Sequence, residues 1–212
     1  MVIAEEQLTL VDTGMPGSSA RAVDFIRRLG RSVEEISWVI ITHNHFDHIG
    51  GVPELRRVAR FTVAAHRAGL ADAGTEPPYP EGMRRLLRIP LLYPVRRRFV
   101  LEPGDVDFHL EGGEVLGPLG GLHVVHTPGH TPGSISLYSP RHRLLMVGDA
   151  LQRRRRYLRL PVKMVSTDLP RALVSVKQMA ELDVDIILFG HGRPLAEDAH
   201  AKLAALIERT QG

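Results

Sequence analysis

One run of potential metal ligands constrains this chain more than any other feature of its sequence. Residues 43–48 contain three histidines and one aspartate, and only Thr42 separates them from the apolar residues 38–41. An apolar run of this kind predicts a buried strand, and the polar side chains that follow it fan out from the strand's end. Neutral imidazole suits zinc and other late first-row metals, and a carboxylate adds a harder oxygen ligand. The sequence therefore predicts a metal site whose first ligands are His43, His45, Asp47 and His48.

The composition limits which groups can hold that metal. The chain has no cysteine, which excludes disulfides, thiolate ligands and a cysteine nucleophile. Of its 212 residues, 43% are hydrophobic and 24% charged, so we expect residues 1–212 to form a single globular domain. No segment has the roughly 18 continuous apolar residues that a membrane span needs. Residues 1–6 lack the features of a signal peptide, so we expect a cytoplasmic protein with no membrane partner.

Arginine supplies almost all of the positive charge. The chain has 24 arginines and three lysines, with a net charge of +3 and an isoelectric point near 9.6. The arginines concentrate in residues 84–98 and 153–159. The ordinary interpretation of such runs is a solvated surface. The alternative is that they attract an anion, such as a substrate carboxylate, a phosphate or a nucleic acid.

The order of predicted elements indicates an α/β (α+β) fold. Ser18 or Ser19 is expected to cap a helix that stops at Gly30 and whose apolar face is Ala22, Val23, Ile26 and Leu29. Residues 71–100, rich in proline and arginine, are expected to be an insertion or lid. This order mixes βα units with a run of consecutive strands, which indicates sheets flanked by helices rather than one parallel doubly wound sheet. Strands are predicted at 7–11, 37–42, 61–65, 98–101, 105–110, 121–126, 134–138, 143–148 and 186–189, and further helices at 53–60, 169–182 and 195–207.

Three later positions repeat the arrangement of an apolar strand followed by a potential ligand. His130 lies in a turn between two Pro-Gly pairs, Asp149 follows the apolar residues 144–147, and His191 follows residues 186–189. Each position alone is weak evidence, because histidine or aspartate at a strand end is often a turn or cap residue. In this order after residues 43–48, they predict one common site.

The complete set resembles the metallo-β-lactamase-fold hydrolases, over a span from Asp12-Thr13-Gly14 to His191. The motifs are His-x-His-x-Asp-His, Thr-Pro-Gly-His-Thr, Gly-Asp and Gly-His-Gly, and they are most similar to the glyoxalase II-like and lactonase-like branch. The resemblance implies a four-layer αββα sandwich and two divalent metal ions, with zinc expected and iron or manganese as alternatives. It also implies that Asp12 does not bind a metal itself but supports and orients the residues that do. One metal would be held by His43, His45 and His130, the other by Asp47, His48 and His191, with Asp149 as a bridge.

That ligand set implies a hydrolase. Two divalent ions leave the site electron-poor, so a bridging hydroxide can form near neutral pH and attack an ester, thioester or lactone carbonyl. Asp47 is the candidate catalytic residue, because its carboxylate can pass a proton to the leaving group. Ser134 and Ser136 are expected to be ordinary strand residues. The expected partner is a small-molecule substrate, with an anionic one as an option, and nucleic acid is disfavoured.

Other functions stay open. A mononuclear iron persulfide (sulfur) dioxygenase would use positions matching His43, His130 and Asp149. A nucleic-acid phosphodiesterase would use the arginine runs, and a catalytically silent scaffold is disfavoured by the intact ligand set. Antibiotic hydrolysis is disfavoured because class B lactamases often carry cysteine, or no carboxylate, where Asp149 stands. A strict hydroxyacylglutathione hydrolase would need a longer segment after His191.

The resemblance has one departure at the N-terminus. Family members usually have one or two strands before the Asp-Thr-Gly strand, and here eleven residues precede Asp12. Either the first hairpin is lost or shortened, or the start codon was placed late. Its loss would leave a sheet edge unpaired, so we expect another protomer or a loop to cover that edge.

Overall fold

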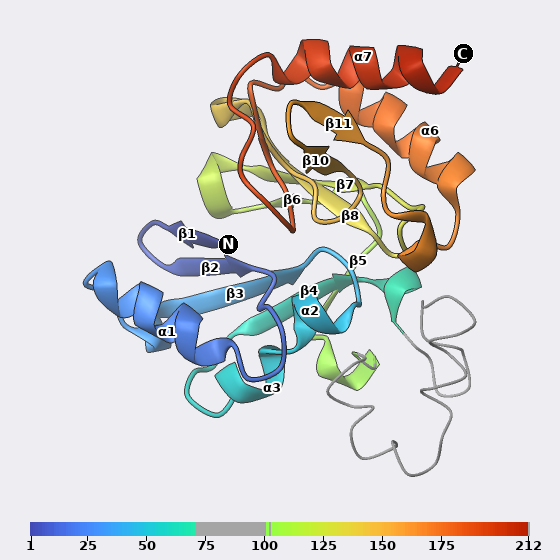
Figure 1. The fold of residues 1–212 in the computed structure, drawn as a ribbon. Coiled ribbons are helices and arrows are strands. Elements are labelled where there is room, and N and C mark those ends of the chain that lie inside the picture. Colours follow the sequence, from blue (N-terminus) through green and yellow to red (C-terminus); the bar gives the residue numbers. More distant parts are fainter. Residues whose placement is uncertain (71–100, 102, 212) are drawn as a thin grey trace, which may run out of the picture. The chain divides into compact units, whose positions relative to one another are not determined.

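The computed structural model describes residues 1–70, 101 and 103–211 (Figure 1). It divides into two compact units, Met1–Leu110 and Glu111–Gly212. The predicted lid at 71–100 and the arginine run at 84–98 lie outside the described residues, as does nearly all of the predicted strand at 98–101. The expectation of a single domain stays a prediction.

The first unit is a five-stranded sheet with helices. Its strand order is β1-β2-β3-β4-β5, where β1 is antiparallel to β2 and every other neighbouring pair is parallel. The strands are β1 (Val2–Ala4), β2 (Leu8–Val11), β3 (Ile36–Ile41), β4 (Thr62–His66) and β5 (Phe108–Leu110), and the α-helices are α1 (Ser19–Arg28), α2 (Phe46–Ile49) and α3 (Val52–Leu55).

The core of this unit comes from the central strands and one face of the helices packed on them. All four residues of β2 are buried, and Ile26 of α1 and Leu55 of α3 pack into the same core. Leu29, which the sequence places on the apolar face of α1, is instead 47% exposed. Ser32 and Glu35 form a capping box at the start of the 3-10 helix Val33–Glu35, in which the Glu35 carboxylate accepts a hydrogen bond from the Ser32 N–H at 2.6 Å.

The second unit has a mixed five-stranded sheet, a separate hairpin and two long helices. The sheet order is β12-β9-β8-β7-β6, in which only β12 and β9 are parallel. Helices α6 and α7 lie side by side and share an apolar core with β9 and β12. The elements are β6 (Val115–Leu116), β7 (Leu122–His126), β8 (Ile135–Ser139), β9 (Leu144–Met146), β10 (Gln152–Arg154), β11 (Tyr157–Arg159), α6 (Leu169–Ala180), β12 (Ile186–Leu188) and α7 (Ala199–Gln211).

Several elements differ from the sequence predictions. The predicted helix at 53–60 is only the single turn of α3, and the last helix begins at Ala199 rather than at residue 195. The arginine run 153–159 forms the β10–β11 hairpin, which was not predicted. Strand β1 was also missed, and it pairs antiparallel with β2. None of the helices among the described residues is long and apolar enough to cross a membrane.

Candidate metal centre

In the first unit, the potential ligands lie where β3 ends. Strand β3 passes into the buried Thr42 and His43, and His45 then precedes the short helix α2. His43, His45 and His48 are all at most 5% exposed. The ring of His43 lies 4.8 Å from the His45 ring and 4.0 Å from the His48 ring, measured between centroids. Three buried imidazoles are therefore held together, with the half-buried Asp47 beside His48 at 3.8 Å.

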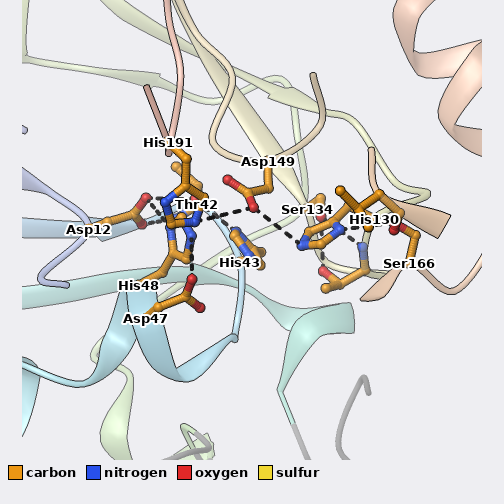
Figure 2. A network of polar contacts seen from close by, with 12 residues as sticks. Asp12, Thr42, His43, Asp47, His48, His130, Ser134, Asp149, Ser166 and His191 are labelled. Carbon is orange, nitrogen blue, oxygen red and sulfur yellow. Dashed lines mark hydrogen bonds and ion pairs between the residues drawn. The ribbon is translucent and has the colours of Figure 1, made fainter. Parts of the chain in front are cut away.

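Asp12 orients two of these histidines. Strands β2 and β3 are parallel neighbours, so their carboxyl ends lie together and bring Asp12 next to Thr42. One Asp12 oxygen accepts the Thr42 N–H, and the other accepts both the Thr42 hydroxyl and the His48 Nδ1–H, at 2.7–2.8 Å. The Thr42 oxygen, having donated its proton, accepts from His43 Nδ1 at 3.1 Å. Figure 2 shows this network. Both rings are thereby left with an unprotonated Nε2, which is the form that binds a metal.

Two further features fix this loop. The buried Asn44 side chain donates to the carbonyls of Gly69 and Leu101 and accepts from the Leu101 N–H, all at 2.8–2.9 Å. After α2, a Cβ atom at Gly50 would lie 2.2 Å from the Pro16 ring, so no other residue fits there.

In the second unit, His130 lies in the turn between β7 and β8. The Ser134 hydroxyl closes this turn by accepting the Thr131 N–H at 3.0 Å. Gly129 has a φ of +137°, and a Cβ atom there would lie 2.4 Å from the backbone of Ala172 at the start of α6. His130 is 1% exposed, and its Nδ1 lies 3.1 Å from the Ser166 hydroxyl.

Asp149 and His191 are brought together by the sheet of the same unit. Strands β9 and β12 are parallel neighbours, and Asp149 and His191 follow their carboxyl ends. The Gly190 N–H donates to the Gly148 carbonyl at 2.7 Å, which extends the pairing beyond the strands. Asp149 Oδ2 lies 3.5 Å from His191 Nε2 and 3.9 Å from His130 Nε2 (Figure 2). Asp149 is buried, whereas the His191 side chain is 55% exposed.

The structure thus groups the seven predicted ligands in two sets, one in each unit. The first unit holds His43, His45, Asp47 and His48, and the second holds His130, Asp149 and His191. Buried imidazoles whose far nitrogen is already hydrogen-bonded, next to carboxylates, form a donor set that suits metal ions. That the seven side chains bind a common pair of ions stays a prediction.

Sequence reasoning missed the residues that support these ligands. It identified Asp12, but it assigned no role to Thr42, Asn44 or Ser166. Thr42 could have been found, because it directly precedes the first ligand. Ser166 gives no such signal, because it lies 36 residues after His130. Ser134 was expected to be a strand residue, and its hydroxyl instead closes the His130 turn, directly before β8.

Two other histidines have structural roles. The Nε2 atom of His126 lies 2.9 Å from the Pro132 carbonyl oxygen, and this contact joins the two ends of the His130 turn. His66 caps the 3-10 helix Arg67–Gly69, because its Nδ1 accepts a hydrogen bond from the Ala68 N–H at 3.1 Å.

The chain belongs to the metallo-beta-lactamase superfamily, whose family model matches residues 1–191. This range contains every predicted ligand and both parts of the donor set described above. It also confirms the resemblance that the motifs indicated.

Relatives at low identity carry hydrolase names. The chain is 28% identical over 200 residues to "Probable metallo-hydrolase YflN" of Bacillus subtilis (strain 168), covering 88% of this chain and 75% of that protein. It is 26% identical over 222 residues to N-acyl homoserine lactonase AiiA of Bacillus thuringiensis subsp. kurstaki, covering 88% and 77%. It is also 29% identical over 157 residues to "Uncharacterized protein YobT" of Bacillus subtilis (strain 168), covering 73% of this chain and only 61% of that protein.

Solved structures confirm the fold class. The metallo-beta-lactamase family protein TTHA1429 from Thermus thermophilus matches with a TM-score of 0.73 at 24% identity, over 99% of this chain and 72% of that chain. The protein TTHA1623, solved in a di-iron-bound form, matches with a TM-score of 0.68 at 22% identity, over 97% and 91%. The chain therefore has the α/β fold of metallo-beta-lactamase proteins.

Proposed function

We propose that this chain is a dinuclear metal-dependent hydrolase of a small ester, thioester or lactone. The observation that carries the proposal is that hydrogen bonds already orient two of the buried imidazoles for metal binding. His43 and His48 already use Nδ1 in hydrogen bonds to Thr42 and Asp12, so each can offer its Nε2 lone pair to a metal. Burying these polar side chains costs free energy. A fold that binds no metal would have no evident use for imidazoles oriented in this way.

The ligands are assigned to two ions. His43, His45 and His130 would hold one metal, and Asp47, His48 and His191 the other, with the carboxylate of Asp149 as a bridge. Such ions, when bound, supply the Lewis acidity that activates water and polarises a carbonyl group. Zinc is the expected ion, because the set contains five imidazoles and two carboxylates and no thiolate.

Two side chains are suited to work beside the ions. The Asp47 side chain is 27% exposed, far more than the buried His48 beside it, so its carboxylate can exchange a proton with a leaving group. The His191 side chain is 55% exposed, which leaves room for a substrate next to it. The lactonase relatives support a lactone or ester as substrate. We expect a small-molecule substrate and a cytoplasmic location, with no role for nucleic acid.

The test combines metal analysis with a substrate panel. Protein purified without added metal is analysed for zinc, iron and manganese, and is then assayed with thioesters, lactones and phosphodiesters. We expect two ions per chain and turnover of a carbonyl substrate. His45→Ala and Asp149→Ala should each abolish turnover while His123→Ala, at an exposed strand position, retains it. One iron per chain with oxygen-dependent persulfide oxidation would replace the proposal with the dioxygenase alternative.

A further inference from the structure

The hydroxyl of Ser166 faces the ring of His130 from the side opposite Asp149. Ser166 Oγ lies 3.1 Å from His130 Nδ1, and it also lies 2.7 Å from the carbonyl oxygen of Val162 (Figure 2). A carbonyl only accepts, so the single hydroxyl proton of Ser166 points to Val162. The Ser166 oxygen must then accept a hydrogen bond from His130, which places the proton on Nδ1 and leaves Nε2 with a lone pair.

The neighbours of Ser166 hold it at that position without its side chain. The Thr167 N–H donates to the His130 carbonyl at 3.1 Å, and the Asp168 N–H donates to the Gly129 carbonyl at 2.9 Å. Asp168 also caps α6 by accepting the Arg171 N–H at 2.9 Å. These backbone bonds join the start of α6 to the His130 turn. The backbone therefore positions Ser166, and its hydroxyl oxygen is available to accept a hydrogen bond from the His130 imidazole.

We propose that Ser166 is a positioning residue that fixes the tautomer and ring orientation of His130 for metal binding through Nε2. This inference rests on the proposed function, because it takes His130 as a metal ligand. It extends to the second unit the arrangement that Asp12 and Thr42 provide in the first. It also explains why a serine 36 residues away in the sequence contacts a nearly fully buried histidine.

Zinc affinity of Ser166 variants tests this role. Zinc-loaded wild type, Ser166→Ala and Ser166→Thr are each titrated with a competing chelator. We expect Ser166→Ala to bind one zinc about 10-fold or more weakly, the usual effect of losing a partner behind a ligand. Ser166→Thr keeps the hydroxyl and should retain wild-type affinity. Equal affinity in Ser166→Ala and wild type would overturn the inference.

Ser175→Ala is the matched control. The Ser175 hydroxyl donates to the Pro128 carbonyl at 2.7 Å, so it supports the same turn from α6 without touching the imidazole. This variant should keep wild-type zinc affinity. If it loses as much affinity as Ser166→Ala, then Ser166 only stabilises the turn and the inference is wrong.

A direct measurement separates this inference from the proposed function. Nitrogen-15 NMR of the imidazoles, with the His130 signals assigned through His130→Gln, reports which ring nitrogen carries the proton. We expect Nδ1–H for His130 in wild type and mixed tautomers in Ser166→Ala. An Nε2–H tautomer in wild type would overturn the role of Ser166. Wild-type protein that binds no zinc but shows Nδ1–H would instead refute the proposed function and leave the role of Ser166 in the ring's orientation standing.

Discussion

At the scale of single residues, the orientation of the candidate ligand histidines depends on the side chains that hydrogen-bond to their Nδ1 atoms. Asp12 adopts a left-handed backbone conformation, with a φ of 58°, which aspartate and asparagine tolerate better than most residues. Both of its carboxylate oxygens are used, one for the Thr42 N–H and one for the Thr42 hydroxyl and His48 Nδ1–H. One carboxylate thus determines which ring nitrogen carries the proton in two imidazoles, directly in His48 and through the Thr42 hydroxyl in His43.

Asp12→Asn tests that role with the least change in shape. Asparagine also tolerates the backbone conformation, but its amide nitrogen would face His48 Nδ1 and donate to it. His48 would then carry its proton on Nε2, the wrong form for binding a metal. We expect metal affinity to fall about 10- to 100-fold, measured by chelator competition, with little change in unfolding free energy. Asp24→Asn, at an exposed position on α1, is the control, and unchanged affinity in Asp12→Asn would contradict the role.

The residues of the candidate site were predicted unequally well. The seven ligands and Asp12 could be named because each follows an apolar strand and matches a family motif. The supporting residues Thr42, Asn44 and Ser166 have ordinary identities and act only through contacts made by the folded chain. Asn44, for example, bonds Gly69 and Leu101, which are far from it in the sequence. No local pattern encodes such partners.

At the scale of elements, the His130 turn depends on close packing against α6. Gly129→Ala should be strongly destabilising, because its Cβ would lie 2.4 Å from the Ala172 backbone and its φ is +137°. We expect a loss of about 3 kcal/mol in unfolding free energy, from strain and overpacking together. Gly113→Ala is the matched control, since Gly113 also has a positive φ, of +98°, but open space around it. Equal losses in the two variants, measured by urea denaturation, would show that packing against α6 contributes nothing.

A second element-scale prediction concerns the start of α1. The Glu54 carboxylate accepts from the Gly17 N–H at 2.7 Å and from the Ser19 hydroxyl, and these hydrogen bonds lower the pKa of Glu54 below its ordinary value of 4.5. A lowered pKa in the folded state means that the ionised carboxylate stabilises the fold above pH 4.5, and that this contribution is lost as the pH falls through the folded-state pKa. Glu54→Gln should therefore lower the unfolding free energy near neutral pH by roughly 0.5 kcal/mol, because solvent screens the carboxylate at this partly exposed position.

The measurement for Glu54 is the unfolding free energy of wild type and variant across acidic pH. The difference between them should shrink as the pH falls below 4.5. Glu208→Gln, at an exposed position on α7, is the control and should show no such trend. A difference that stays constant down to the lowest accessible pH would contradict the prediction.

Elements were predicted where the pattern is long and were missed where it is short. Helix α6 and strands β3, β7 and β8 were expected because apolar periodicity or an apolar run extends over five residues or more. Strand β1 has only three residues, and β10 and β11 lie in a run of arginines that hides any alternation, whereas the equally short β9 and β12 lie within longer apolar runs. Strands β1, β10 and β11 form because each pairs with a neighbouring strand in a hairpin, and the residue composition does not reveal that pairing.

At the scale of the whole molecule, the proposed ligand sets come from both units of the chain. If each ion is held by groups from both units, metal binding stabilises the folded chain as a whole, by RT ln(1 + [metal]/Kd), or about 4 kcal/mol when free metal is about 1,000 times Kd. Zinc-loaded protein should therefore unfold at a clearly higher temperature than metal-stripped protein, as measured by calorimetry. His45→Ala, in the first unit, and His130→Ala, in the second, should each remove the part of this gain that comes from the ion they are proposed to share, whereas His123→Ala should keep the whole gain. A gain that stays complete in either ligand variant would show that the substituted histidine does not hold that ion, and the shared dinuclear centre would have to be abandoned.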